Sequence, residues 1–176
     1  MGLLNTIVGS TIGAVINGQI KRPVNNLVES FIDNAVRDKV SAPAIGSVIY
    51  CDLAAGTAEH SGIYIGSNNI VHLSGDGIIE RVNPKQFINR LGGWNTAISI
   101  YVSCNAGTPV GSTNVAKLAE SMIGSQRSYN LIMDNCHQFT AGCLSGNFEN
   151  SCNFFTFLKD EVQIRIGGTE WRVWDL

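Results

Sequence analysis

Residues 27–36 repeat apolar side chains every three to four positions, with charged residues between them. The apolar set is Leu27, Val28, Phe31, Ile32, Ala35 and Val36. This period is that of an amphipathic α-helix, which buries one stripe of its surface. Ser41-Ala-Pro43 would end the helix, because proline disfavours the helical conformation of the preceding residue. The pattern predicts an apolar and amphipathic N-terminal extension, residues 1–42, followed by the main domain, residues 43–176.

From Ala44 onward the pattern changes to short runs of β-branched and aromatic residues, bounded by glycine, asparagine or serine. Such runs are typical of β-strands. They cover residues 46–53, 61–65, 69–73, 77–82 and 97–102. Because the runs are consecutive and separated by turn residues, they predict a mostly antiparallel sheet of about five strands.

Helical periodicity appears between and after these runs. Residues 84–90 predict a short helix before the fifth strand, and residues 114–123 and 134–146 predict two longer helices. The tail at residues 170–175 alternates like a strand that is added to the edge of the sheet. Strands grouped first and helices afterwards indicate an α+β fold in which the antiparallel sheet packs against helices.

The composition narrows the range of partners. With 176 residues, 44% of them apolar and 15% charged, the chain is large enough for one globular domain with its own core. The net charge is −2, and the lysine and arginine residues are scattered along the chain. A nucleic-acid partner is therefore not expected, because there is no basic patch to contact phosphates.

The cysteines and the first residues indicate a compartment. The five cysteines show neither C-x-x-C pairs nor zinc-ligand spacing, which predicts reduced thiols and no metal site. Lys21 and Arg22 follow the apolar N-terminal stretch, whereas a cleaved export signal carries its basic residues before it. We therefore expect a cytoplasmic protein without a cleaved signal peptide.

Residues 3–16 are uncharged, apolar and punctuated by glycine. The stretch is too short to span a bilayer. Three uses are left open: packing on the domain or oligomerisation, peripheral contact with a membrane surface, or a flexible leader.

Cys136 lies at the start of the predicted helix at 134–146, directly after Asn135. The unpaired N–H groups and the positive end of the dipole at a helix N-terminus stabilise a thiolate. The same N–H groups, together with the amide of Asn135, would bind the oxyanion formed when an acyl carbon becomes tetrahedral. This position makes Cys136 the candidate nucleophile of an acyl-transfer site.

His60 and His72 are the candidate proton carriers, on two strands of one predicted hairpin. A three-residue loop centred on Gly66 would place His60 directly opposite His72, so that their rings touch. A turn at Asn68-Asn69 would instead place His72 opposite Tyr64. The turn residues alone do not decide between the two registers, but the chemistry favours the first. Strict alternation places Tyr64 on the face of His60, where it would line the site or pack.

Three stretches carry a family resemblance: His60-Ser-Gly-Ile-Tyr-Ile-Gly66, Ile70-Val-His-Leu73 and Asn135-Cys-His-Gln-Phe139. Together they resemble the lecithin:retinol acyltransferase family and its relatives, the H-Ras-like suppressor phospholipases and acyltransferases. The first stretch is equally similar to bacterial cell-wall cysteine peptidases of the NlpC type. In those peptidases the cysteine precedes both histidines, whereas here it follows them, as in the acyltransferase-like group.

The resemblance implies a circularly permuted papain-like (NlpC-type) fold over about residues 45–146. It also implies Cys136 as nucleophile, His60 as general base and His72 as the third member of the triad. Such an enzyme takes an acyl-bearing lipid or peptide, forms a thioester and requires no metal or organic cofactor. Those acyltransferases usually carry Asn-Cys-Glu-His-Phe, and this chain departs from the pattern at His137 and Gln138, so that the acidic residue after the cysteine is missing. His137 is predicted to face another side of the helix, toward solvent or a hydrogen bond.

Two other functions are kept beside acyl transfer. One is a cysteine peptidase or amidase acting on peptide or cell-wall material. The other is a module that binds a membrane or a partner and retains the fold without turnover.

Overall fold

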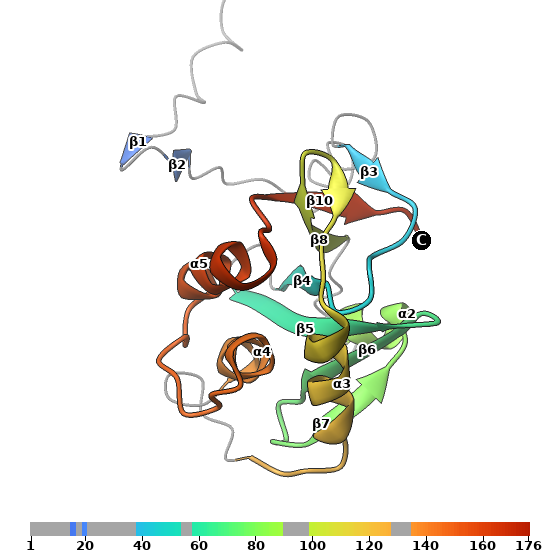
Figure 1. The fold of residues 1–176 in the computed structure, drawn as a ribbon, viewed down its shortest axis with the longest axis vertical. Coiled ribbons are helices and arrows are strands. Elements are labelled where there is room, and N and C mark those ends of the chain that lie inside the picture. Colours follow the sequence, from blue (N-terminus) through green and yellow to red (C-terminus); the bar gives the residue numbers. More distant parts are fainter. Residues whose placement is uncertain (1–14, 17–18, 21–37, 54–57, 90–98, 128–134) are drawn as a thin grey trace, which may run out of the picture.

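The predicted strands form the centre of the sheet (Figure 1). The computed structural model describes residues 15–16, 19–20, 38–53, 58–89, 99–127 and 135–176. The central strands are β4 (Val48–Leu53), β5 (Ala58–Gly66), β6 (Asn69–Leu73), β7 (Ile79–Val82) and β8 (Ile100–Asn105). They lie in the order β8-β4-β5-β6-β7, each antiparallel to its neighbour. The prediction of five adjacent antiparallel strands is confirmed.

The sheet is larger than predicted, and it is mixed. Among the described residues it has eight strands, because β3 (Lys39–Val40), β9 (Thr108–Pro109) and β10 (Glu170–Trp174) join it. β10 is antiparallel to β8 and parallel to β3. The prediction that the tail adds a strand to an edge is confirmed, because β10 pairs with β8, the edge of the five central strands, and β3 then extends the sheet beyond β10. Two buried side chains, Val40 and Trp174, lie at paired positions of this junction.

The N-terminal region is described only in part. β1 (Val15–Ile16) and β2 (Gln19–Ile20) pair in an antiparallel two-stranded sheet. The predicted helix at residues 27–36 and most of the apolar stretch at residues 3–16 lie outside the described residues. The boundary between residues 42 and 43 stays a prediction.

Four helices accompany the sheet in the described ranges. They are α2 (Pro84–Ile88), α3 (Thr113–Ser121), α4 (Cys136–Ser145) and α5 (Phe155–Ile166). The first three match the predicted helices, and α5 was not predicted. None of the helices in these ranges is long and apolar enough to cross a membrane. The α+β class is confirmed, and the permuted papain-like topology stays a prediction.

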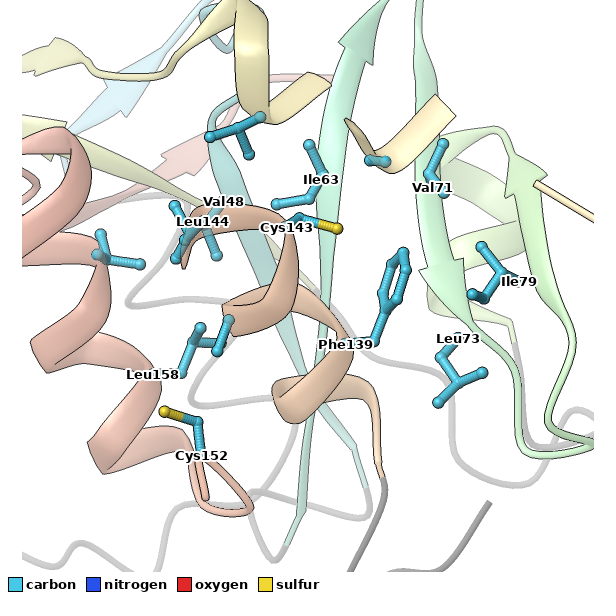
Figure 2. Close-up of a cluster of buried hydrophobic side chains, with 14 of the residues drawn as sticks. Val48, Ile63, Val71, Leu73, Ile79, Phe139, Cys143, Leu144, Cys152 and Leu158 are labelled. Atoms are coloured by element: carbon cyan, nitrogen blue, oxygen red, sulfur yellow. The ribbon is translucent and has the colours of Figure 1, made fainter. Parts of the chain in front are cut away.

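Each face of the sheet has its own hydrophobic core. On one face α3, α4 and α5 cover a cluster that includes Val48, Ile63 and Val71, and Figure 2 shows Phe139 of α4 pointing into it. On the other face a second cluster includes Phe87 of α2. Since successive strand residues point to opposite faces, β5 can present one side chain to α4 and the next to α2.

Candidate active site

The β5–β6 hairpin takes neither of the two predicted registers. Ser67 and Asn68 form a two-residue turn with φ values of 49° and 56°, and Gly66 pairs with Asn69. Turns with two positive φ angles match the twist of a hairpin, and asparagine tolerates this conformation. The register shifts between Tyr64 and Gly66, so Ile63 pairs with Val71. The predicted placement of His60 directly opposite His72 is therefore wrong.

The two imidazole rings nevertheless meet, as the prediction required. His60 Nε2 lies 3.1 Å from His72 Nδ1, and both rings are buried. If the pairing of Ile63 with Val71 is continued by one residue, His72 lies opposite Gly62, which is two residues from His60 in β5. A Cβ at Gly62 would lie 2.8 Å from Val71 O and 3.1 Å from His72 Cβ. Glycine at position 62 therefore allows β6 to approach closely enough for the diagonal contact.

Cys136 is the first residue of α4, as predicted for a nucleophile at a helix start. Asn135 is the N-cap: its Oδ1 accepts from the backbone N–H groups of His137 and Gln138 at 2.9 and 3.2 Å. Its Nδ2 donates to Asn153 O at 2.7 Å. Asparagine is a favoured N-cap because its oxygen satisfies N–H groups that have no helical partner. The Asn135 amide thus anchors the helix start, and an oxyanion-binding role for it stays a prediction.

The Cys136 sulfur lies at the edge of β5, where pairing with β6 stops. Tyr64 exchanges hydrogen bonds with the segment before β4, its N–H donating to Ser47 O. Because backbone groups alternate in direction along a strand, those of Glu59 and Ser61 face the opposite side, toward β6. The sulfur donates to Glu59 O at 3.9 Å and is hydrogen-bonded by the Ser61 backbone N–H. Cys136 therefore contacts both chain neighbours of His60.

The environment of Cys136 differs from the predicted one in its effect on the thiol. Burial raises the pKa of the thiol above its ordinary value. Hydrogen bonds from Ser61 and from the backbone N–H groups of Cys136 and His137 lower it in part. The helix start thus supplies donors to the sulfur, but burial dominates, so the neutral thiol is favoured in this closed arrangement.

Ser61 points to the face opposite His60 and meets α4. Its Oγ lies 2.9 Å from His137 Nδ1 and 3.1 Å from Thr140 Oγ1. Thr140 Oγ1 in turn donates to the carbonyl oxygen of Cys136 at 2.8 Å. The His137 ring is 5% exposed and packs on Phe155, with ring centroids 5.6 Å apart. His137 is buried, so the hydrogen-bond alternative of its prediction is confirmed and the solvent alternative is wrong.

Burial lowers the pKa of His137 to about 4, which predicts a pH-dependent stability. The unfolded chain, whose histidine titrates near 6.5, takes up this proton first as the pH falls. The free energy of unfolding should therefore decrease by up to about 3 kcal/mol between pH 6.5 and pH 4 through this residue. Urea denaturation of the wild type and of His137→Asn would measure it as a pH-dependent difference. A difference that stays constant across this range would contradict the prediction.

Glu80 lies beside the histidine pair. His72 and Glu80 are directly paired across β6 and β7, and Glu80 Oε1 lies 3.5 Å from His72 Nε2. The His72 ring is fully buried, whereas the Glu80 side chain is 41% exposed. Sequence reasoning missed this carboxylate. The Gly-rich turn before β7 could have indicated it, because a hairpin centred there places residue 80 opposite residue 72.

The remaining candidates have mainly structural contacts. Tyr64 is buried, and its ring meets that of Trp174 edge to face, with centroids 5.3 Å apart. It belongs to the core on the α2 face, and a site-lining role for it stays a prediction. In the described ranges no group of three or more His, Cys, Asp or Glu residues could hold a metal ion.

The comparisons with known proteins add one match. A family model described as lecithin retinol acyltransferase matches residues 41–149. No match was found among curated proteins. The matched region contains the histidine pair, the strand edge and the start of α4. The chain therefore belongs to the lecithin retinol acyltransferase family.

Proposed function

We propose that the protein is a cysteine-dependent acyl-transfer enzyme that works through a thioester on Cys136. One observation carries the proposal: the Cys136 sulfur contacts Glu59 and Ser61, on either side of His60. His60 in turn contacts His72 at 3.1 Å. A thiol, a first imidazole and a second imidazole that orients the first are the parts that nucleophilic catalysis by cysteine needs.

The Glu80 carboxylate determines which ring nitrogens of the histidine pair carry protons. Since it lies 3.5 Å from His72 Nε2, it favours the tautomer that carries its proton on this nitrogen. His72 Nδ1 is then an acceptor, and His60 Nε2 donates to it. This leaves Nδ1 of His60 unprotonated, so that it can accept a proton from Cys136. Glu80 and His72 are thus positioning residues for the base.

In the first step, His60 takes the thiol proton and the Cys136 sulfur attacks the carbonyl carbon of an ester or amide. The oxyanion that forms is stabilised by the backbone N–H of Cys136, which the Asn135 side chain leaves unused at the start of α4. As the tetrahedral species collapses, the His60 imidazolium returns the proton to the leaving group. Water or another nucleophile then takes the acyl group, and the thiol is restored.

Burial opposes the first of these steps. Because it raises the pKa of the Cys136 thiol, a lone thiolate is unfavourable in the closed site. Proton transfer to His60 produces a thiolate–imidazolium pair, whose mutual attraction offsets part of this cost. The proposal therefore ties reactivity to His60 and not to the helix start alone.

The family assignment supports an acyl ester as the donor, since the family is described by a lecithin retinol acyltransferase. A peptide amide is the alternative donor. Both would leave an acyl group on the same sulfur, so the mass of the trapped intermediate distinguishes them.

The proposal is tested by intact-mass detection of the acyl-enzyme. The protein is incubated with phosphatidylcholine vesicles, an N-acylated amine and a peptide amide in separate reactions. We expect an adduct on the wild type and none on Cys136→Ala. Cys143→Ala is the matched control, because it removes another buried cysteine of the same helix and should keep the adduct. An equal adduct yield on Cys136→Ala would overturn the assignment, and no adduct from any donor would favour a binding module.

A further inference from the structure

Ser61 joins three groups in the interior between β5 and α4. Its hydroxyl contacts His137 Nδ1 at 2.9 Å and Thr140 Oγ1 at 3.1 Å, and it also hydrogen-bonds the Cys136 sulfur. The Ser61 and Thr140 side chains are fully buried, and His137 is 5% exposed. Because these groups are buried, bulk water does not compete for their hydrogen bonds. The direction of each hydrogen bond within the network therefore matters.

The directions follow from counting hydroxyl protons. Thr140 gives its only hydroxyl proton to the carbonyl oxygen of Cys136, at 2.8 Å. In the contact between the two hydroxyls, Ser61 must therefore be the donor. The Ser61 oxygen is then the acceptor for His137, which carries its proton on Nδ1. Burial lowers the pKa of His137 to about 4, so the ring is neutral near pH 7, and the hydrogen bond to Ser61 then fixes the proton on Nδ1.

The Ser61 proton thus lies where both Thr140 Oγ1 and the Cys136 sulfur can accept it. An anionic sulfur is the stronger acceptor, because a charged partner strengthens a hydrogen bond. The donor therefore shifts toward the sulfur when the thiol loses its proton. Since Ser61 and His60 point to opposite faces of β5, the sulfur receives this hydrogen bond from the side opposite His60.

We propose that Ser61 and His137 form a buried donor relay in which His137 orients the Ser61 hydroxyl toward the Cys136 sulfur. The inference rests on the proposed function in that it takes Cys136 as the nucleophile. Ser61 contacts the reacting sulfur, and His137 acts through Ser61 as a positioning residue. The relay acts on the face of the sheet opposite the histidine pair and is separate from the proton path through His72 and Glu80.

The test reads the thiol itself and needs no substrate. Alkylation of Cys136 by iodoacetamide is followed by peptide mass between pH 6 and pH 10, and the midpoints of the pH–rate curves are compared. The midpoint is compared instead of the alkylation rate itself. Opening of the buried site changes that rate by the same factor at every pH and so leaves the midpoint unchanged. The ionisable side chains on the elements that surround the network include Glu59 and His60 of β5 and Lys159 of α5, whose nitrogen lies 4.6 Å from the centroid of the Phe155 ring.

We expect Ser61→Ala to raise the midpoint by about one pH unit, so that alkylation near pH 7 slows roughly tenfold. His137→Leu should shift it in the same direction, and the double variant should shift it no further than Ser61→Ala alone. His137→Asn should stay near the wild type, because its Nδ2 replaces the donor at Nδ1. Thermal melting of each variant checks that it is folded.

Two results would overturn the relay. One is an unchanged midpoint in folded Ser61→Ala. The other is a larger shift for His137→Asn than for His137→Leu, which packing against Phe155 alone would produce. Failure of the relay is distinguishable from failure of the proposed function, because the acyl adduct on Cys136 is measured separately. The adduct can form without the relay, and the midpoints can shift without any adduct.

Discussion

Replacement of His60 by glutamine should lower the rate of acyl-enzyme formation by about 10³-fold while the protein stays folded. Glutamine can still donate to His72 Nδ1, which lies 3.1 Å from the present donor, but it cannot take the thiol proton. Since burial raises the pKa of the Cys136 thiol, almost no thiolate would form without a base. Time courses of adduct mass on the wild type and on His60→Gln would measure the loss.

The residual rate supplies an internal check on the role of His60. If His60 is the base, the slow reaction of His60→Gln should accelerate with pH, because solvent hydroxide must then remove the proton. The matched control is Glu80→Gln, which keeps both rings and alters only the carboxylate 3.5 Å from His72 Nε2. We expect a smaller loss for this variant than for His60→Gln. A wild-type rate in folded His60→Gln would remove His60 from the mechanism.

The central strands and three helices were predictable because their residues follow one period each. β4 to β8 alternate or carry β-branched runs, and α4 ends at Gly146, which has the positive φ of 77° typical of a helix C-cap. α5 was missed because apolar residues lie on two of its sides. Phe155 and Leu158 are buried, whereas Phe157 and Ile164 are at least half exposed, and this blurs the helical period.

The hairpin register shows a limit of a different kind. The sequence Gly66-Ser-Asn-Asn69 allows several turns, and a one-residue change moves every later side chain. The shift between Tyr64 and Gly66 was not visible in the pattern, because a bulge leaves no fixed signature. The contact between His60 and His72 was predicted correctly although the register was wrong, because diagonal neighbours on one face of a sheet lie within reach of long side chains.

The histidine pair was found from its motif, but the groups around the sulfur were not. Ser61 and His137 are 76 positions apart and meet only because α4 packs across β5. Local spacing contains no information on such a contact. The effect of burial on the Cys136 thiol could not be predicted either, since it depends on how completely the strand edge and the helix start enclose the sulfur.

The glycine before β4 determines how that strand meets α3. Gly46 has a φ of +79°, a conformation that side-chain-bearing residues rarely adopt. A Cβ at this position would lie 1.8 Å from the carbonyl oxygen of Ser112, the residue that precedes α3. The Gly46 N–H also donates to Tyr64 O at 2.8 Å, so the backbone is held on both sides. An alanine here could be accommodated only if α3 moved away from the sheet.

Gly46→Ala should therefore reduce the free energy of unfolding by more than about 3 kcal/mol, from the steric overlap and the backbone strain together. Gly75→Ala is the matched control: a Cβ there has nothing within 4 Å, and we expect a change of no more than about 0.5 kcal/mol. Urea denaturation followed by tryptophan fluorescence would measure both. Because β4 pairs with β5 along the segment that contains His60, Gly46→Ala should also slow acyl-enzyme formation at urea concentrations below the unfolding midpoint of the variant. Equal stability of the two variants would contradict the prediction. It would show that the backbone around Gly46 and Ser112 shifts with no loss of unfolding free energy, and that β4 and α3 are not fixed to each other at this point.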